Sequence, residues 1–184
     1  DVHNWSYVSA GERFKFGSVY LNAMGDDANS FLYYMLIHLV GSLFPGISGT
    51  SWAGYLVNIA FAIAVVWILW FLSGRFDLTS TERTIVVAFY AFSMHCIEFV
   101  TLSRAYMVST FFQILLIYLH VLLMQAIKAN QLTRAKRCLC FLIPVYALGY
   151  VTHYTILFFA GRTGVAMIVW FIRGKHPLMK NYII

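Results

Sequence analysis

Long apolar runs constrain the fold of this chain more than any other feature of its sequence. The four runs cover residues 53–72, 85–102, 105–127 and 138–172. An α-helix needs about 20 apolar residues to cross a bilayer, so each of the first three runs can supply one crossing. The fourth run, with 35 residues, is long enough for two crossings. Polar side chains at residues 152–154 predict the turn between them.

The composition agrees with a membrane protein. Hydrophobic residues make up 61% of the chain and charged residues 11%, whereas about a quarter of an ordinary soluble domain is charged. We therefore expect an all-α, polytopic transmembrane helical bundle. The chain starts at Asp1 rather than Met and ends on the apolar Ile184, which predicts the N-terminal part of a longer protein. The expected helices are at about 53–72, 85–102, 105–127, 138–152 and 153–172.

Residues 1–52 differ from the rest because charged and aromatic side chains are mixed along them. Aromatic rings of this kind prefer the headgroup level of a membrane. Within this segment, residues 31–44 form an apolar run of fourteen, which is too short to cross a bilayer. The segment therefore predicts a loop with a juxtamembrane helix at 31–44. Farther along, Thr79 and Glu82 have the spacing of a capping box, which predicts a helix start.

The basic residues predict which side of the membrane each loop occupies. If residues 1–52 lie outside, nine of the thirteen lysine and arginine residues face the cytoplasm, as the positive-inside rule requires. The basic segment 128–137 contributes most. We expect a multi-pass protein of the bacterial plasma membrane with an extracytoplasmic first loop. The net charge of +6 does not indicate nucleic-acid binding, because no basic patch with interleaved aromatic residues lies on a soluble segment.

In this orientation, the polar side chains inside or beside the apolar runs gather on the outer side. Ionisable groups at membrane depth are costly to keep there, and they are functional candidates for that reason. The candidates are Asp26, Asp27, Glu98, Arg104, Tyr106 and His153. The sequence alone does not show that these side chains meet.

Four short segments occur in an order that resembles a known family. They are Phe16–Tyr20 with Asp27, Leu32–Leu36, Arg104–Met107 and Thr152–Tyr154. Together they resemble the GT-C superfamily of membrane glycosyltransferases, in particular the bacterial relatives of protein O-mannosyltransferases and of lipid A aminoarabinose transferase. The resemblance covers nearly the whole chain.

The resemblance implies an enzyme of the GT-C type. Such enzymes take a sugar from a polyprenyl-phosphate carrier and attach it, usually by inverting displacement, to a glycan, lipid or protein acceptor on the outer face of the membrane. Asp27 matches an aspartate of the family, and Arg104, Tyr106 and His153 match its Arg-x-Tyr and Thr-His-Tyr motifs. The chain departs from the family at 29–31, where Asn-Ser-Phe replaces His-Pro-Pro. The main catalytic acid of the family would precede residue 1 or be Asp1.

The two aspartates and the arginine have distinct expected roles. Asp27 would act as the base for the acceptor hydroxyl or would hold a divalent cation such as Mg²⁺ or Mn²⁺, and Asp26 is a second candidate. A carboxylate favoured by the dipole of the following helix is the alternative for Asp27. Arg104 would bind the lipid phosphate through its planar fork, or would extend to the lipid headgroups instead.

Tyr106 and His153 complete the predicted site. The Tyr106 hydroxyl would donate to the phosphate, unless the side chain only anchors the end of a span at the interface. The imidazole of His153 would donate to the phosphate or move a proton, and a buried packing role is the alternative. Glu98 would pair with Arg104 or serve the site.

A transporter or flippase-like protein for a lipid-linked substrate is the alternative function, as is a binding protein without catalytic activity. A transporter is expected to place polar or broken-helix positions near the middle of the membrane. The candidate residues here gather on one side, which favours the enzyme. The replacement of His-Pro-Pro keeps the non-catalytic alternative open.

Overall fold

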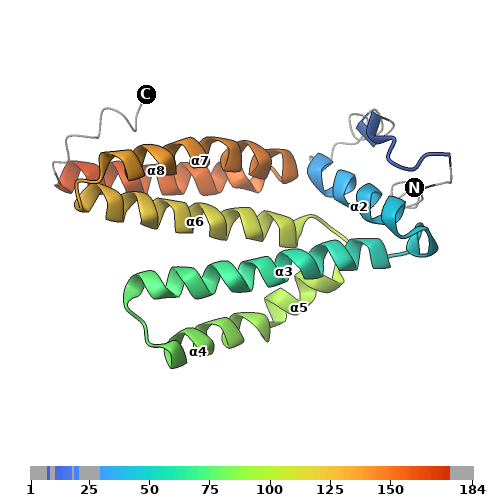
Figure 1. Ribbon diagram of the computed structural model, residues 1–184, viewed down its shortest axis with the longest axis horizontal. Helices are drawn as coiled ribbons and strands as arrows, with labels where there is room; N and C mark the ends of the chain where they lie inside the picture. The colour runs from blue at the N-terminus through green and yellow to red at the C-terminus, as the bar shows by residue number, and fades with distance from the viewer. Residues whose placement is uncertain (1–7, 9–10, 18, 21–29, 175–184) are drawn as a thin grey trace.

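The computed structural model describes residues 8, 11–17, 19–20 and 30–174. These residues contain no β-strand, and helices dominate them (Figure 1). The prediction of an all-α protein is confirmed at this level, whereas the GT-C arrangement remains a prediction.

Four helices are long and apolar enough to cross a membrane. They are α3 (Trp52–Ser73), α6 (Tyr106–Lys128), α7 (Leu132–Thr152) and α8 (Thr155–Gly174). Many of their large apolar side chains are exposed, which suits contact with lipid. The expectation of a multi-pass membrane protein is supported by these helices. α7 ends and α8 begins where the sequence predicts the turn.

The predicted continuous helix at 85–102 is wrong, because the structure breaks this run in two. Helix α4 (Ser80–Ala91) and helix α5 (Met94–Thr101) meet at an angle of 49°. Ser93 explains the break, since its Oγ accepts a hydrogen bond from the backbone N–H of Cys96 (3.1 Å) and donates to the carbonyl of Tyr90 (2.7 Å). The first of these hydrogen bonds caps the N-terminus of α5, and the second gives a partner to a carbonyl near the C-terminus of α4. If the bent pair forms one crossing, the spans number five.

The beginnings of two other helices are set by their polar residues. The capping box at the start of α4 is confirmed: Thr79 Oγ1 accepts from the backbone N–H of Glu82, and the Glu82 carboxylate accepts from the backbone N–H of Thr79 at 2.7 Å. α7 begins at Leu132, six residues before the predicted 138. Its first turns therefore contain Arg134 and Lys136, which the sequence analysis assigns to a loop.

A helix forms where the juxtamembrane helix is predicted: α2 (Phe31–Leu43) is followed by a short 3₁₀ helix, η2 (Pro45–Ile47). The position of α2 beside the membrane stays a prediction. α2 contacts α3 and α7. The described part of the N-terminal segment lies against it, since Phe14 N–H donates to Ser42 Oγ at 3.1 Å. With thirteen residues, α2 is too short to cross a bilayer.

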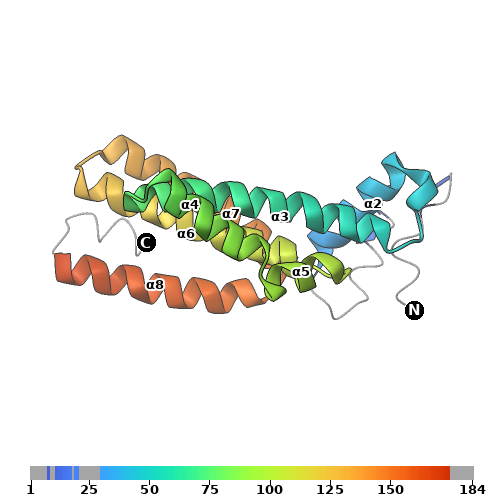
Figure 2. The same ribbon diagram turned by 90° about the horizontal axis from the view of Figure 1, so that it is seen from below.

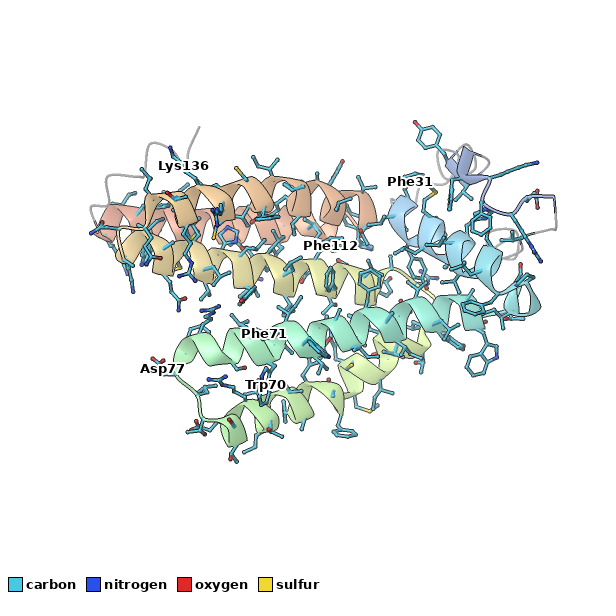
Figure 3. The ribbon with its side chains drawn as sticks, in the orientation of Figure 1. Phe31, Trp70, Phe71, Asp77, Phe112 and Lys136 are labelled. Carbon is cyan, nitrogen blue, oxygen red and sulfur yellow. The ribbon has the colours of Figure 1, made fainter. Side chains whose placement is uncertain are left out.

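The connections between helices fall at two ends of the bundle (Figures 1 and 2). We call the end where α5 joins α6 (102–105) and α7 joins α8 (153–154) the site end. The opposite end, where α3 joins α4 (74–79) and α6 joins α7 (129–131), is the basic end. Lys136 and Asp77 lie there, and Phe31 lies far from them (Figure 3). Helix α6 is central, because it contacts α3, α5, α7 and α8.

Candidate functional site

Three of the predicted site residues lie at the site end of the bundle. Arg104 is in the connection between α5 and α6, Tyr106 is the first residue of α6, and His153 lies between α7 and α8. The rings of Tyr106 and His153 are 5.6 Å apart between centroids. The structure therefore brings together two residues that are far apart in the sequence. Arg104, two residues before Tyr106, has an exposed side chain that is accessible to an anionic ligand.

His153 has a defined tautomer. Its Nδ1 accepts a hydrogen bond from the backbone N–H of Thr155 at 3.3 Å and lies 3.0 Å from Thr155 Oγ1. Because a backbone N–H can only donate, Nδ1 carries no proton and the neutral ring has its proton on Nε2. Burial lowers the pKa of His153 below its ordinary value. At neutral pH, His153 therefore presents an Nε2–H donor rather than a positive charge.

An aromatic row extends from α5 to the turn before α8. His95 and Phe99 are 3.9 Å apart between ring centroids, and Phe99 is stacked on Tyr106 at 5.4 Å. Beyond Tyr106, the ring of His153 is stacked on Tyr154 at 4.6 Å. The sequence analysis did not include His95 or Phe99 among the candidates. Their spacing of four residues in an apolar helix is a weak signal, because such pairs occur in any aromatic-rich span.

Polar side chains continue from this row along α6. Thr155 Oγ1 lies 3.4 Å from Ser109 Oγ, and Gln113 Nε2 donates to Ser109 Oγ at 3.4 Å. Ser109 is buried, so this part of the helix interface is polar inside the bundle. Buried polar groups usually have such partners, because leaving them unpaired costs about 1–3 kcal/mol.

The connection that carries Arg104 is held by α3. Asn58, which is fully buried, donates through Nδ2 to the carbonyls of Phe99 (3.1 Å) and Leu102 (2.6 Å). One turn earlier on α3, Gly54 faces Ser103. Sequence analysis missed this contact. The only available signal was an amide side chain in an otherwise apolar run.

Tyr33 of α2 also contacts this junction between α3 and the α5–α6 connection. Its side chain is 1% exposed, and its hydroxyl and Asn58 Oδ1 make no hydrogen bond of acceptable geometry with the described residues. Burial raises the pKa of Tyr33 to about 12, although the neighbouring Ser103 and Asn58 side chains act in the opposite direction. Tyr33 is therefore a neutral hydroxyl at the junction of α2, α3 and the α5–α6 connection.

The structure says less about the three acidic candidates, Asp26, Asp27 and Glu98. Asp26 and Asp27 lie outside the described residues, so their predicted roles stay predictions. Glu98 lies on α5 with an exposed side chain. Within the described ranges, no group of three His, Cys, Asp or Glu side chains could hold a metal ion. A divalent cation at Asp27 is therefore neither supported nor excluded by the geometry.

Comparisons with known proteins give no relative of this chain, so the candidate site is argued from its geometry. No family model, no curated protein and no solved structure matches the chain.

Proposed function

We propose that this chain is part of a membrane glycosyltransferase that moves a sugar from a polyprenyl-phosphate donor to an extracytoplasmic glycan, lipid or protein acceptor. The observation that carries the proposal is the position of Arg104 beside the contact between Tyr106 and His153, at the end of the bundle away from the clustered basic residues. A guanidinium, a phenol and an imidazole N–H are donors that can bind the oxygens of a phosphate leaving group and stabilise its charge.

The positive-inside rule supports an extracytoplasmic position for this site. Positively charged residues flank the helices at the basic end, so the rule assigns this end to the cytoplasm. The exposed basic residues there are Arg75, Lys128, Arg134, Lys136, Arg137 and Arg173. The site end then faces outward, on the side where the proposed acceptor is found.

The proposed reaction is a direct displacement at the anomeric carbon of the sugar. The acceptor oxygen forms a bond to this carbon while the bond from the carbon to the phosphate oxygen breaks. The proton of the acceptor hydroxyl passes to the Asp27 carboxylate, with Asp26 as the second candidate. Arg104 binds the negative charge that develops on the leaving phosphate, and Tyr106 and His153 donate hydrogen bonds to its oxygens.

If a divalent cation takes part, Asp27 is the residue we propose to hold it. A hard cation such as Mg²⁺ or Mn²⁺ prefers carboxylate oxygens and would supply positive charge to the phosphate. Transfer activity measured with EDTA and then with added Mg²⁺ or Mn²⁺ tests this part of the proposal.

The break between α4 and α5 favours a second function. Discontinuous helices are typical of transporter sites within the membrane, and the bend at residues 92–93 divides one candidate span. A transporter or flippase-like protein for a lipid-linked substrate, or a binding protein without turnover, would use Arg104 to hold the phosphate but would break no bond.

The deciding experiment measures transfer of radiolabelled sugar in membranes that contain the protein, from a panel of polyprenyl-phosphate sugars. We expect transfer from at least one donor and its loss in Arg104→Ala and Asp27→Asn. Arg137→Ala, at the basic end, is the matched control and should retain transfer. Donor binding that depends on Arg104 without any transfer would contradict the enzyme and support the second function.

A further inference from the structure

The end of α5 is capped by a side chain from another helix. The last carbonyls of an α-helix have no partner within the helix. The Asn58 amide of α3 donates to two carbonyls at the end of α5, those of Phe99 (3.1 Å) and Leu102 (2.6 Å). Asn58 is separated from them by 41 and 44 residues. A single buried amide thus fixes where α5 ends relative to α3.

Gly54 makes a second contact with the same connection. Gly54 and Asn58 are four residues apart and share one face of α3. A Cβ atom at Gly54 would overlap with Ser103 Oγ and would lie 3.1 Å from Ser103 Cβ and 3.0 Å from the Tyr33 hydroxyl. Any side chain at this position would displace Ser103. The connection therefore packs directly against the backbone of α3.

Both contacts immediately precede Arg104. The Arg104 backbone N–H donates to the Leu102 carbonyl at 2.7 Å, and this carbonyl is also the one bound by Asn58. On the other side of Arg104, Ala105 is 3% exposed. The backbone of Arg104 is thus held on both sides, while its side chain is exposed.

We propose that Asn58 and Gly54 are positioning residues that set the place of Arg104 for phosphate binding. This inference rests on the proposed function of Arg104. A donor aimed at a developing charge is effective only when it is held in place before the reaction.

The first test measures the connection itself and needs no activity. Hydrogen exchange by mass spectrometry in nanodiscs compares the wild type with Asn58→Leu, which removes the amide but keeps the branched shape and the number of heavy atoms. We expect amides of residues 102–106 to lose protection, while residues 74–79 at the basic end are unchanged. Val65→Ala, which removes buried volume from the same helix, is the control. Equal loss in Val65→Ala, or no loss in Asn58→Leu, would overturn the proposal.

The second test asks whether the effect passes through Arg104. If transfer occurs, Asn58→Leu should lower it about ten- to a hundredfold, the range expected for a misplaced reacting group. Added to Arg104→Lys, which keeps measurable transfer, the same change should cause a smaller loss than it does in the wild type, because residues acting through one group are not additive. Full additivity would overturn the proposal. Absence of transfer in the wild type would contradict the enzyme proposal, and the exchange test would still decide the positioning.

A pair of glycine variants tests the close packing. Gly54→Ala should expose residues 102–106 to exchange, and adding Ser103→Ala, which removes the nearest atom, should restore part of the protection. Gly164→Ala is the matched control, because no atom lies within 4 Å of a Cβ there. Exchange that is unchanged in Gly54→Ala, or not restored by Ser103→Ala, would count against the role of Gly54.

Discussion

The two ends of the bundle hold their polar residues in different ways. At the basic end, charged side chains make the contacts: Arg75, which follows α3, donates to Tyr118 Oη of α6 at 3.2 Å, and Arg83 of α4 donates through Nε to the Leu78 carbonyl just before α4 at 2.8 Å. At the site end, the neutral side chain of Asn58 is completely buried and joins two helices.

This difference suggests that the residues that orient the chain in the membrane are not the ones that shape the proposed site. Charges in short loops set the orientation of a membrane protein, and at the basic end they remain largely in contact with solvent or headgroups. Buried neutral groups must find partners within the protein, because the membrane interior offers no water, and the Asn58 amide finds its partners at the end of another helix. Neutral contacts of this kind build the geometry around Arg104, so a high density of charge does not mark the end where the proposed site lies.

Labelling from opposite sides of the membrane gives the largest expected effect. In a background without the three native cysteines, Lys136→Cys should react with an impermeant maleimide only from the cytoplasmic side and Tyr154→Cys only from the outside. The reason is that Lys136, in the first turns of α7, and Tyr154, in the connection after α7, lie at opposite ends of this helix. Labelling of both from one side would show that the two ends do not face opposite sides of the membrane.

Arg104→Lys tests whether the shape of the cation matters at the site end. Lysine keeps the charge but cannot bind a phosphate through two parallel hydrogen bonds. We expect transfer, or donor binding if there is no turnover, to fall about 50-fold, corresponding to the loss of one charged hydrogen bond. Arg137→Lys at the basic end should have no effect. Full activity of Arg104→Lys would mean that only the charge is needed.

Gly149→Leu tests the packing that brings His153 to the site. A Cβ at Gly149 would lie 3.2 Å from Ile156 side-chain atoms and 3.3 Å from Phe112 Cβ, so a larger side chain forces α7, α6 and α8 apart. We expect a loss of about 2 kcal/mol in unfolding free energy, typical of overpacking. Gly161→Leu, in open space on α8, is the control for thermal unfolding in detergent. Similar melting of the two variants would refute the close packing.

Thr79→Ala examines the basic end. Loss of the Thr79 cap should cost about 1 kcal/mol of stability and leave transfer unchanged, because α4 begins far from Arg104. Thermal unfolding and the transfer assay check both parts. A selective loss of transfer without loss of stability would show that the two ends are coupled.

The smallest effect concerns pH. Burial lowers the pKa of His153 in the folded protein, so the unfolded chain binds its proton more readily. The stability contributed by the neutral ring is present above the unfolded pKa of about 6.5 and is lost as the pH falls through the lower folded value. Between pH 7.5 and 5, the melting temperature of the wild type should fall more than that of His153→Gln. An equal fall would show that His153 does not titrate in this way.

Much of the fold could be predicted from the sequence because it depends on local properties. The apolar lengths predict the spans, and the pair Thr79 and Glu82 predicts the start of α4. The break at Ser93 was missed because hydrophobicity alone does not reveal it. A capping serine three residues before Cys96 was its local signal, and the serine competes with the helix backbone for hydrogen bonds.

The candidate site was predicted only in part. Arg104, Tyr106 and His153 could be named from their residue types and positions next to apolar runs. The contact between Tyr106 and His153 could not be predicted, nor could the role of Asn58. These depend on which helices are neighbours and on how each is rotated about its axis.

The sequence by itself determined that the chain is helical, that several of its helices can span a membrane and where its positive charges cluster. These properties follow from the transfer of apolar groups out of water and from hydrogen bonds within each helix. Only the tertiary structure decided that Asn58 of α3 caps α5 and that Ser103 packs into the space left by the missing side chain of Gly54. The physical reason is that a buried amide and a missing Cβ act only through groups brought to them by packing, more than forty residues away.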